Sequence, residues 1–174
     1  VIVRWTHTWY DPSIEKEAGK ALLDEGCDIL TEHESTEASL QPAEEKGLMT
    51  IGYTTDMSKT LPKSYLTSSG YNWAAYYVPT FQAIKAGTWT KANFWGGIDT
   101  GVCELPSYSA RVSDKSKSIV AEYSAKIKNK TFTVFAGPLY KQDGSVAVPA
   151  GAAATDEEIL SMDYFVQGVS GKAK

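Results

Sequence analysis

Carboxylates, imidazoles and aromatic rings gather in three polar loops of this sequence. The residues are His7, Trp9, Tyr10, His33, Glu34 and Asp56. Carboxylates and imidazoles can transfer protons or bind metals, whereas aromatic faces stack on planar ligands for about 1–3 kcal/mol each, judged from base stacking. The three loops could therefore form either a catalytic site or a binding site for a flat heteroaromatic molecule.

A hydrolase that uses His7, Glu34 and Asp56 is one hypothesis for these loops. However, the sequence contains no HxH, HExxH or CxxC spacing, no G-x-S-x-G and no glycine-rich phosphate loop. Histidines in loops commonly hydrogen-bond to backbone, and Asp56 could equally be a loop-capping residue. We therefore favour binding over catalysis, and we expect no catalytic residue, no metal ion and no cofactor.

Each polar loop follows a short apolar run that is typical of a buried strand. The runs are Val1–Trp5, Cys27–Thr31 and Leu48–Tyr53. Asp11 is a good helix cap and Pro12 a good first helical residue, so a helix is expected from there to Gly26. A second helix is expected between Thr36 and Lys46, where Pro42 is a potential break. Right-handed crossovers in this βαβαβ pattern bring all three loops to one edge of a parallel sheet, where open α/β folds bind ligands.

The rest of the chain continues as mixed α/β. Tyr65–Ser69 is expected to be a strand, and it leads into the aromatic-rich segment Asn72–Ala86. Pro79 should kink a helix there or delay its start to Val78. Further strands are expected at Asn93–Gly97, Gly101–Leu105, Thr131–Phe135 and Val146–Val148, and helices after Ser113 and from Thr155 through Met162.

Composition indicates a globular protein that does not bind nucleic acid. The chain has 174 residues, of which 43% are hydrophobic and 22% charged, and its net charge is −4. The lysines from Lys115 to Lys130 surround an amphipathic helix, which indicates a solvated face. Cys27 and Cys103 are interpreted as small buried residues rather than a disulfide or metal ligands. No apolar run approaches the roughly 18 residues of a membrane span.

Seven blocks of the sequence, in order, resemble the Bmp family of substrate-binding proteins, the basic membrane protein or purine-nucleoside-receptor group that serves ABC importers. The blocks are TWYDP, GCDILTEHEST, AEEKG with IGYTTDM, YLTSSGYNWAAYY, the W-G-G at 95–97, FAGPLYKQDGS and EEILSMDYFVQGV. This resemblance implies a type I periplasmic-binding-protein-like α/β fold with two lobes that close on a small-molecule ligand. It also implies an extracytoplasmic or periplasmic location and an ABC transporter permease as partner.

The same resemblance implies how the chain is divided between the lobes. Residues 1–66 would begin the carboxyl-terminal lobe, residues 67–100 would complete the amino-terminal lobe, and residues 101–174 would return to the first one with a terminal hairpin and helix. Family members have roughly twice this length. We therefore expect the amino-terminal half, with any export signal or membrane anchor, to be a missing partner of this chain.

Site residues follow from the resemblance and from the aromatic content. The aromatic residue at the place of Trp9 stacks on the base in nucleoside-binding members, and an acidic residue at the place of Asp56 hydrogen-bonds the ligand. Tyr10 and Glu34 lie in the same loops, and Tyr71, Asn72 and Trp73 lie in the next one. These last three stand where nucleoside-binding members carry a lysine, which favours a free purine base such as adenine over a nucleoside. A flavin or a thiamine-like vitamin remains an alternative ligand.

Overall fold

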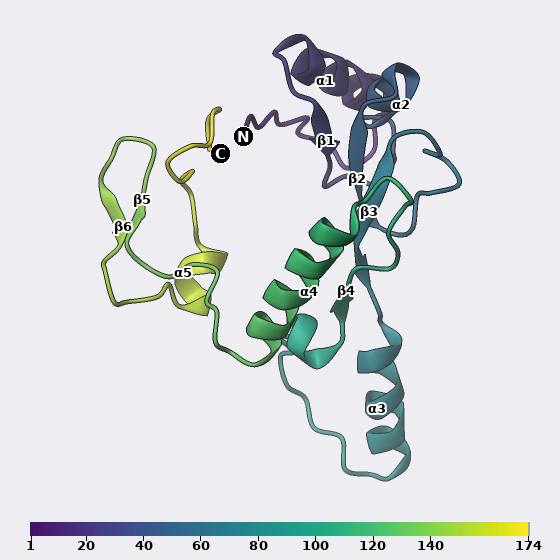
Figure 1. Ribbon diagram of the computed structural model, residues 1–174. Helices are drawn as coiled ribbons and strands as arrows, with labels where there is room; N and C mark the ends of the chain where they lie inside the picture. The colour runs from purple at the N-terminus through teal and green to yellow at the C-terminus, as the bar shows by residue number, and fades with distance from the viewer. Residues whose placement is uncertain (174) are drawn as a thin grey trace.

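The computed structural model describes residues 1–173 and contains a four-stranded sheet with helices beside it (Figure 1). The strands are β1 (Ile29–Thr31), β2 (Met49–Thr54), β3 (Tyr65–Tyr71) and β4 (Cys103–Glu104), and they lie in that order. The first three strands pair in parallel, and β4 pairs antiparallel with β3. The predicted α/β class with a parallel sheet is therefore confirmed.

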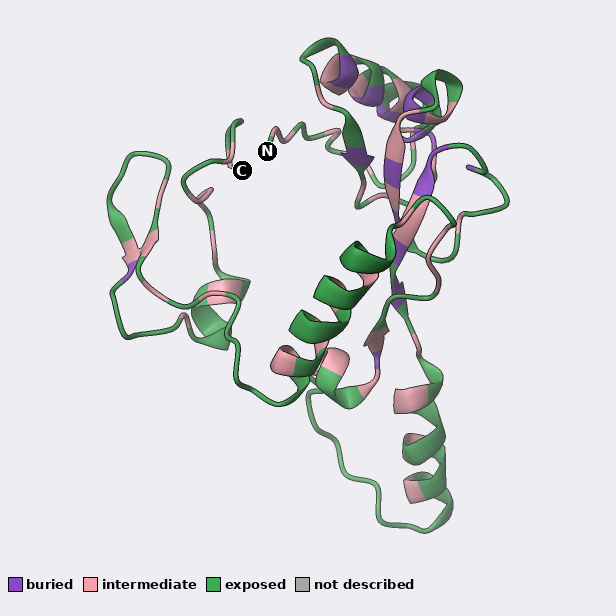
Figure 2. Cartoon of the chain, in the orientation of Figure 1, coloured by how far each residue is buried: buried purple, intermediate pink, exposed green. Residues whose placement is uncertain are grey.

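The hydrophobic core lies where helices α1 (Pro12–Asp24) and α2 (Gln41–Lys46) pack against the sheet. Its buried residues are Leu23, Leu30, Leu40, Ala43, Leu61 and Tyr65. Figure 2 shows that buried positions are concentrated in these helices and in β1 to β3, while the remainder of the chain is largely exposed. The core thus supports the part of the sheet that carries the first polar loops.

Local sequence explains how both helices begin and how α2 ends. Asp11 caps α1, because its Oδ1 accepts hydrogen bonds from the N–H groups of Ser13 and Ile14, each at 3.1 Å. Pro42 lies in the first turn of α2 and so starts the helix instead of breaking it. Gly47 ends α2 with φ 66°, a left-handed conformation that suits glycine.

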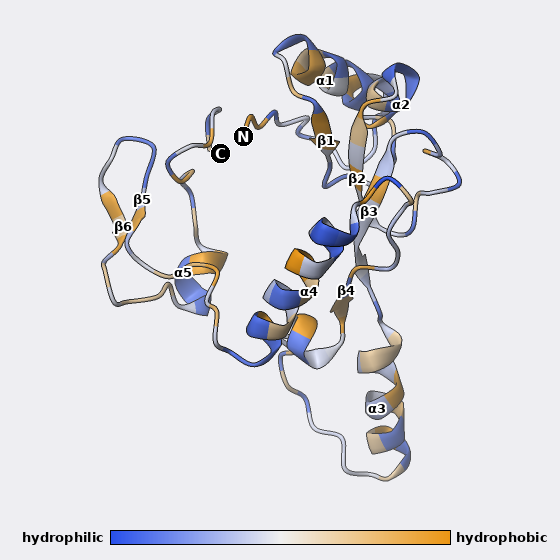
Figure 3. Cartoon of the chain, viewed as in Figure 1, coloured by the Kyte–Doolittle hydropathy of each residue, from blue (hydrophilic) through white to orange (hydrophobic). Residues whose placement is uncertain are grey.

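The segment after β3 projects away from the core. Helix α3 (Ala74–Lys85) extends beyond the sheet, and α4 (Asp114–Lys128) lies beside β3 and β4, near the short 3-10 helix η1 (Ile98–Thr100) (Figure 1). No residue of α3 is buried, although much of the helix is apolar (Figure 3). It begins at Ala74 and continues through Pro79, so the predicted start near Val78 is wrong. Among residues 1–173, no helix is long and apolar enough to cross a membrane.

The last part of the chain forms an arm that stands apart from the sheet (Figure 1). It contains the antiparallel hairpin β5 (Leu139–Tyr140) and β6 (Val146–Val148), followed by α5 (Asp156–Leu160). A capping box starts α5, because the Thr155 and Glu158 side chains each accept a hydrogen bond from the other residue's backbone N–H. The predicted hairpin and last helix are thus confirmed.

Three predicted strands are absent, and a fourth is shorter than expected. Val1–Trp5 forms one isolated bridge, in which Val3 N–H donates to Ser170 C=O at 2.9 Å. Thr131–Phe135 is irregular and ends in a turn at residues 134–135, and the Thr131 N–H donates to the Lys126 C=O at 2.9 Å at the end of α4.

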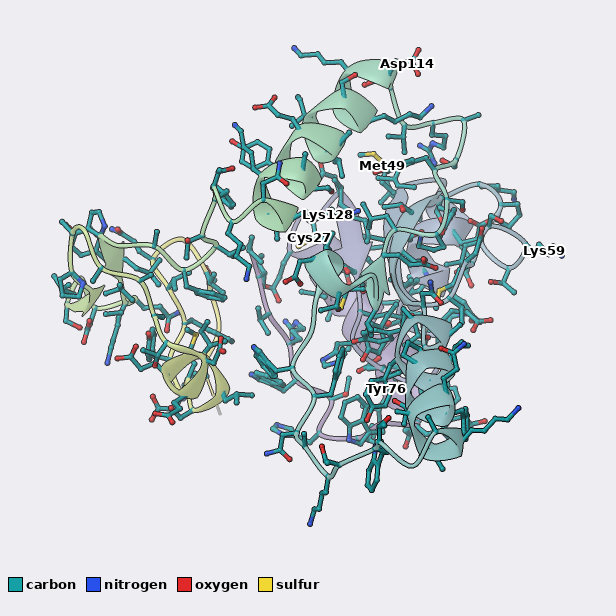
Figure 4. All side chains as sticks on the ribbon, turned by 90° about the horizontal axis from the view of Figure 1, so that it is seen from below. Cys27, Met49, Lys59, Tyr76, Asp114 and Lys128 are labelled. Carbon is teal, nitrogen blue, oxygen red and sulfur yellow. The ribbon has the colours of Figure 1, made fainter. Side chains whose placement is uncertain are left out.

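Packing and turn geometry also replace strand pairing in the segment before β4. The predicted strand Asn93–Gly97 is irregular, and Phe94 packs its ring 4.6 Å from that of Tyr76, which Figure 4 labels on α3. Gly101 has φ 77° and ends η1, so the strand predicted from there to Leu105 is reduced to Cys103–Glu104.

Candidate functional site

A row of aromatic rings crosses the carboxyl ends of the parallel strands. Measured between ring centroids, Trp9 lies 5.4 Å from His33, and His33 lies 4.5 Å from Tyr53, both edge to face. Tyr53 lies 6.1 Å from Tyr71, which lies 5.4 Å from Trp73. These separations are those of favourable aromatic pairs. We call these five residues the aromatic row.

Strand endings place most members of this row. Tyr53 is the penultimate residue of β2, Tyr71 is the last residue of β3, and Trp73 immediately precedes α3. Because β2 and β3 run in parallel, their carboxyl ends meet at one edge of the sheet. The aromatic row therefore lies at the edge where the sequence predicted a ligand.

The hydroxyl groups within the row are linked. Tyr53 Oη is 2.9 Å from His33 Nε2 and 3.4 Å from Tyr71 Oη. The hydrogen bond with Tyr71, helped by partial burial, raises the pKa of Tyr53 to about 12, so its phenol remains protonated at neutral pH. Trp9 is 63% exposed and Trp73 is 49% exposed, which leaves ring surface accessible to a ligand.

Hydrogen bonds hold the first polar loop against the second. The Ser35 N–H donates to the Trp9 C=O at 3.0 Å, and Thr6 Oγ1 donates to Glu34 Oε1 at 2.6 Å. Buried Glu15 ties the two loops further, because it accepts from the Asp11 N–H and from the Thr36 hydroxyl. Trp9 therefore stays beside His33 although residues 1–5 do not join the sheet.

A cavity of about 660 Å³ adjoins the start of the aromatic row. It lies between residues 1–9, α1 and β1, and both Trp9 and His33 line it. Glu32 and Glu34 also face it. Burial raises the pKa of Glu32 to about 8, against the opposing effect of a hydrogen bond from Ser39.

Close backbone packing positions Ser39 for that hydrogen bond. Its Oγ donates to Glu32 Oε2 at 2.7 Å. A Cβ at Gly19 would lie 2.0 Å from the Ser39 C=O oxygen, so only glycine allows α1 to approach this loop so closely. Gly19 thus helps to fix the carboxyl group of Glu32 at the cavity.

Asp56, which the sequence placed at the site, has other partners. Its Oδ1 accepts from the Ser58 N–H at 2.8 Å, and its Oδ2 accepts from Ser107 Oγ at 2.5 Å. The Ser107 hydrogen bond is the main cause that lowers the pKa of this exposed carboxyl group. Asp56 therefore caps its own loop and ties it to the segment after β4.

Two other predicted site residues, Tyr10 and Asn72, are close in sequence to members of the aromatic row but are not part of it. Tyr10 is 71% exposed. Asn72 follows Tyr71, and its N–H donates to the Val102 C=O at 2.8 Å. Trp9, Tyr71 and Trp73 belong to the aromatic row itself.

Sequence reasoning missed three residues, namely Glu32, His33 as a member of the row, and Tyr53. Tyr53 ends an apolar run and was interpreted only as part of a strand, although strand-end position was itself the signal. Glu32 directly follows β1, so the same signal applied to it.

The two carboxyl groups of the hydrolase hypothesis have hydroxyl and backbone amide partners. Glu34 accepts from Thr6, while Asp56 accepts from Ser58 and Ser107. Within residues 1–173, no three His, Cys, Asp or Glu side chains are grouped closely enough to hold a metal ion. Cys27 and Cys103 are both free thiols.

Comparisons with known proteins agree with this architecture. Residues 1–136 match the Bmp family model, described as ABC transporter substrate-binding protein PnrA-like. A purine-binding protein of Brucella abortus is 37% identical over 172 residues, which are 99% of this chain and 49% of that protein. A Haloferax volcanii protein named as an ABC transporter glucose-binding protein is 33% identical over 171 residues, which are 98% of this chain and 41% of that one.

Solved structures share the fold at low sequence identity. An ABC transporter solute-binding protein from Conexibacter woesei has a TM-score of 0.63 at 20% identity, covering 75% of this chain and 45% of that one. A protein from Bacillus halodurans described as a transcriptional activator of the comK gene has a TM-score of 0.67 at 19% identity, covering 75% and 47%. The chain spans about half the length of the curated relatives it matches. With a family model that matches residues 1–136, the chain belongs to the Bmp family of ABC transporter substrate-binding proteins.

Proposed function

We propose that the protein to which this chain belongs is the extracytoplasmic solute-binding component of an ABC importer, and that it binds a purine such as adenine. The single observation that carries the ligand class is the aromatic row at the carboxyl ends of the strands. Partly exposed rings offer stacking surfaces that suit a flat heteroaromatic molecule and do not require charge on the ligand. The name of the Brucella abortus relative supports the same class.

The ligand is held and released without chemical change in this proposal. Binding by stacking and hydrogen bonding needs none of the nucleophile and base pairs that define hydrolases. The acidic groups at the cavity then act as hydrogen-bonding partners, and their role is recognition.

A second lobe completes the site in this proposal. Residues 72–102 leave the sheet after β3 and return at β4, and they include α3, none of whose residues is buried. Residues 67–71 of the expected stretch 67–100 lie in β3, which pairs with β2, so we assign residues 72–100 to the second lobe, whose remainder the other half of the full-length protein would supply. Hinge closure of the two lobes would enclose the ligand and present the closed form to a transporter permease.

Glucose is the second candidate ligand, because the Haloferax volcanii relative carries that name. Native mass spectrometry of the full-length protein, purified without added ligand, separates the two. A carried-over molecule with the mass of a purine base supports the proposal. A hexose, or any ligand without an aromatic ring, would contradict it.

A further inference from the structure

The cavity beside the aromatic row combines an apolar wall with two acidic side chains. Val3, Trp5, Leu22 and Leu30 supply apolar wall, and the volume of about 660 Å³ exceeds that of a single-ring or double-ring heterocycle. Trp9 and His33 line the same cavity, so it is continuous with the first members of the row.

Each of the two acidic side chains uses only one of its oxygens within the described part of the chain. Glu34 Oε1 accepts from Thr6 Oγ1 at 2.6 Å, and Glu32 Oε2 accepts from Ser39 Oγ at 2.7 Å. Their other oxygens, Glu34 Oε2 and Glu32 Oε1, are buried and have no hydrogen-bond partner there. Buried polar atoms are nearly always paired, and leaving one unpaired costs about 1–3 kcal/mol. Each of these oxygens can accept one further hydrogen bond, and a donor group that reaches it would remove this cost.

The protonation of Glu32 adds a second capability. Because burial raises its pKa to about 8, Glu32 is mostly a neutral acid at pH 7. A neutral carboxyl group both donates and accepts, whereas an ionised one only accepts. Glu32 can thus match an edge that carries an N–H group next to a ring nitrogen.

We infer that Glu32 and Glu34 form the polar end of the solute site and select ligands that present N–H groups along one edge of a planar ring. The face of the same ring would lie on Trp9 or His33. This inference rests on the proposed function and deepens it, since it specifies the ligand as an amino-substituted or N–H-bearing heteroaromatic. It adds Glu32, which strand-loop patterning left out, as a specificity residue.

The test compares two probes on the full-length protein by isothermal titration calorimetry. Adenine carries ring and exocyclic N–H groups, whereas 9-methylpurine has a similar flat ring system without any N–H. The variants are Glu32→Met and Glu34→Met, which keep an unbranched side chain of similar length but remove both oxygens. Glu157→Gln is the matched control, because Glu157 is exposed on α5.

The wild-type protein should bind adenine at least about tenfold more tightly than 9-methylpurine, and each Met variant should lose most of that preference. Binding of 9-methylpurine should persist in the variants, which also reports that they are folded. Glu157→Gln should behave as wild type.

Three results would overturn the inference. If both Met variants keep the wild-type preference for adenine, Glu32 and Glu34 do not read N–H groups, while the proposed purine binding stands. If they weaken both probes equally, the two residues have only a structural role. If the wild-type protein binds neither probe, the proposed function fails and the inference fails with it.

Discussion

At the scale of single residues, Trp9 is the member of the aromatic row whose removal should weaken ligand binding most. It is 63% exposed and is held by the Ser35 hydrogen bond to its carbonyl. Trp9→Ala should weaken purine binding by the full-length protein by about 1–3 kcal/mol, which calorimetry measures. Trp89→Ala removes a 50% exposed indole outside the row and should leave affinity unchanged. Equal effects of the two substitutions would remove Trp9 from the site.

The substitution Asp56→Asn tests whether Asp56 contacts the ligand or caps its own loop. Because Ser58 and Ser107 already occupy its two oxygens, Asp56→Asn should lower the melting temperature by a few degrees and leave purine affinity close to wild type. Differential scanning calorimetry with and without adenine separates the two effects. If the Asp56→Asn variant is fully folded but binds purine more weakly, then Asp56 contacts the ligand, as the family resemblance implied.

Glu32 should make stability fall as the pH rises. Its carboxyl group stays protonated in the folded chain up to a pKa of about 8, but it ionises near its ordinary value of about 4.3 when the chain unfolds. The folded state therefore binds the extra proton between these values, and stability is lost as the pH increases through that window. After allowance for solvent screening, the loss should be on the order of 1–3 kcal/mol.

Glu32→Gln should flatten this part of the stability profile, because an amide does not titrate. Urea unfolding of the ligand-free protein at pH 5 and pH 8.5 gives the comparison, and Glu157→Gln should retain the wild-type slope. An unchanged slope in Glu32→Gln would show that Glu32 is not the titrating group.

Sequence predicted the loops of the site better than the individual side chains in them. Trp9, Tyr71 and Trp73 were predicted from the aromatic content of the loops at the strand ends and, for Trp9, from the family resemblance. His33 and Tyr53 were not assigned to the row, because their significance depends on ring contacts between loops that are far apart in sequence. The raised pKa of Glu32 likewise depends on burial, which no local pattern gives.

At the scale of elements, the first residues of the chain behave differently from their sequence pattern. Val1–Trp5 has the composition of a buried strand, yet it pairs with the carboxyl-terminal segment. Trp5 Nε1 donates to the Lys172 C=O at 2.8 Å, and its ring stacks 6.3 Å from that of Phe165. Composition predicts that a segment can be a strand, but it does not identify the partner strand.

Trp5→Ala should release this pairing. Hydrogen exchange of the Ser170 amide, which donates to the Val1 C=O at 2.7 Å, should become at least about tenfold faster, because local opening needs fewer contacts to break. Trp89→Ala serves again as the control. Unchanged exchange at Ser170 would mean that Trp5 does not hold the two chain ends together.

The successful element predictions share strong local signals. The start of α1 follows from Asp11 and Pro12, and the last helix follows from a capping box. The strand predicted at Gly101–Leu105 is shortened and the one at Thr131–Phe135 is absent, because Gly101 ends η1 and the Thr131 N–H closes the end of α4, which apolar composition does not reveal. Pro79 does not delay the start of α3, and Thr80 Oγ1 donates to the Tyr76 C=O at 2.8 Å within the same turn.

At the scale of the whole molecule, α3 should be packed inside the second lobe, against the half of that lobe that the rest of the full-length protein supplies. Its exposed side chains include Phe81, which is 68% exposed in this chain. Phe81→Asp should therefore lower the melting temperature of the full-length protein by several degrees, because it places a charge in an apolar interface. Val134→Asp, at a 60% exposed loop position, should have little effect. Equal, small effects would contradict the assignment of residues 72–100 to the second lobe.

The central claim is that the aromatic row belongs to a purine site, and direct titration of the full-length protein tests it. Calorimetry should detect one adenine per chain with a dissociation constant on the order of 1 μM or lower, and no binding of glucose under the same conditions. Saturable binding of glucose with no heat from adenine would contradict the account.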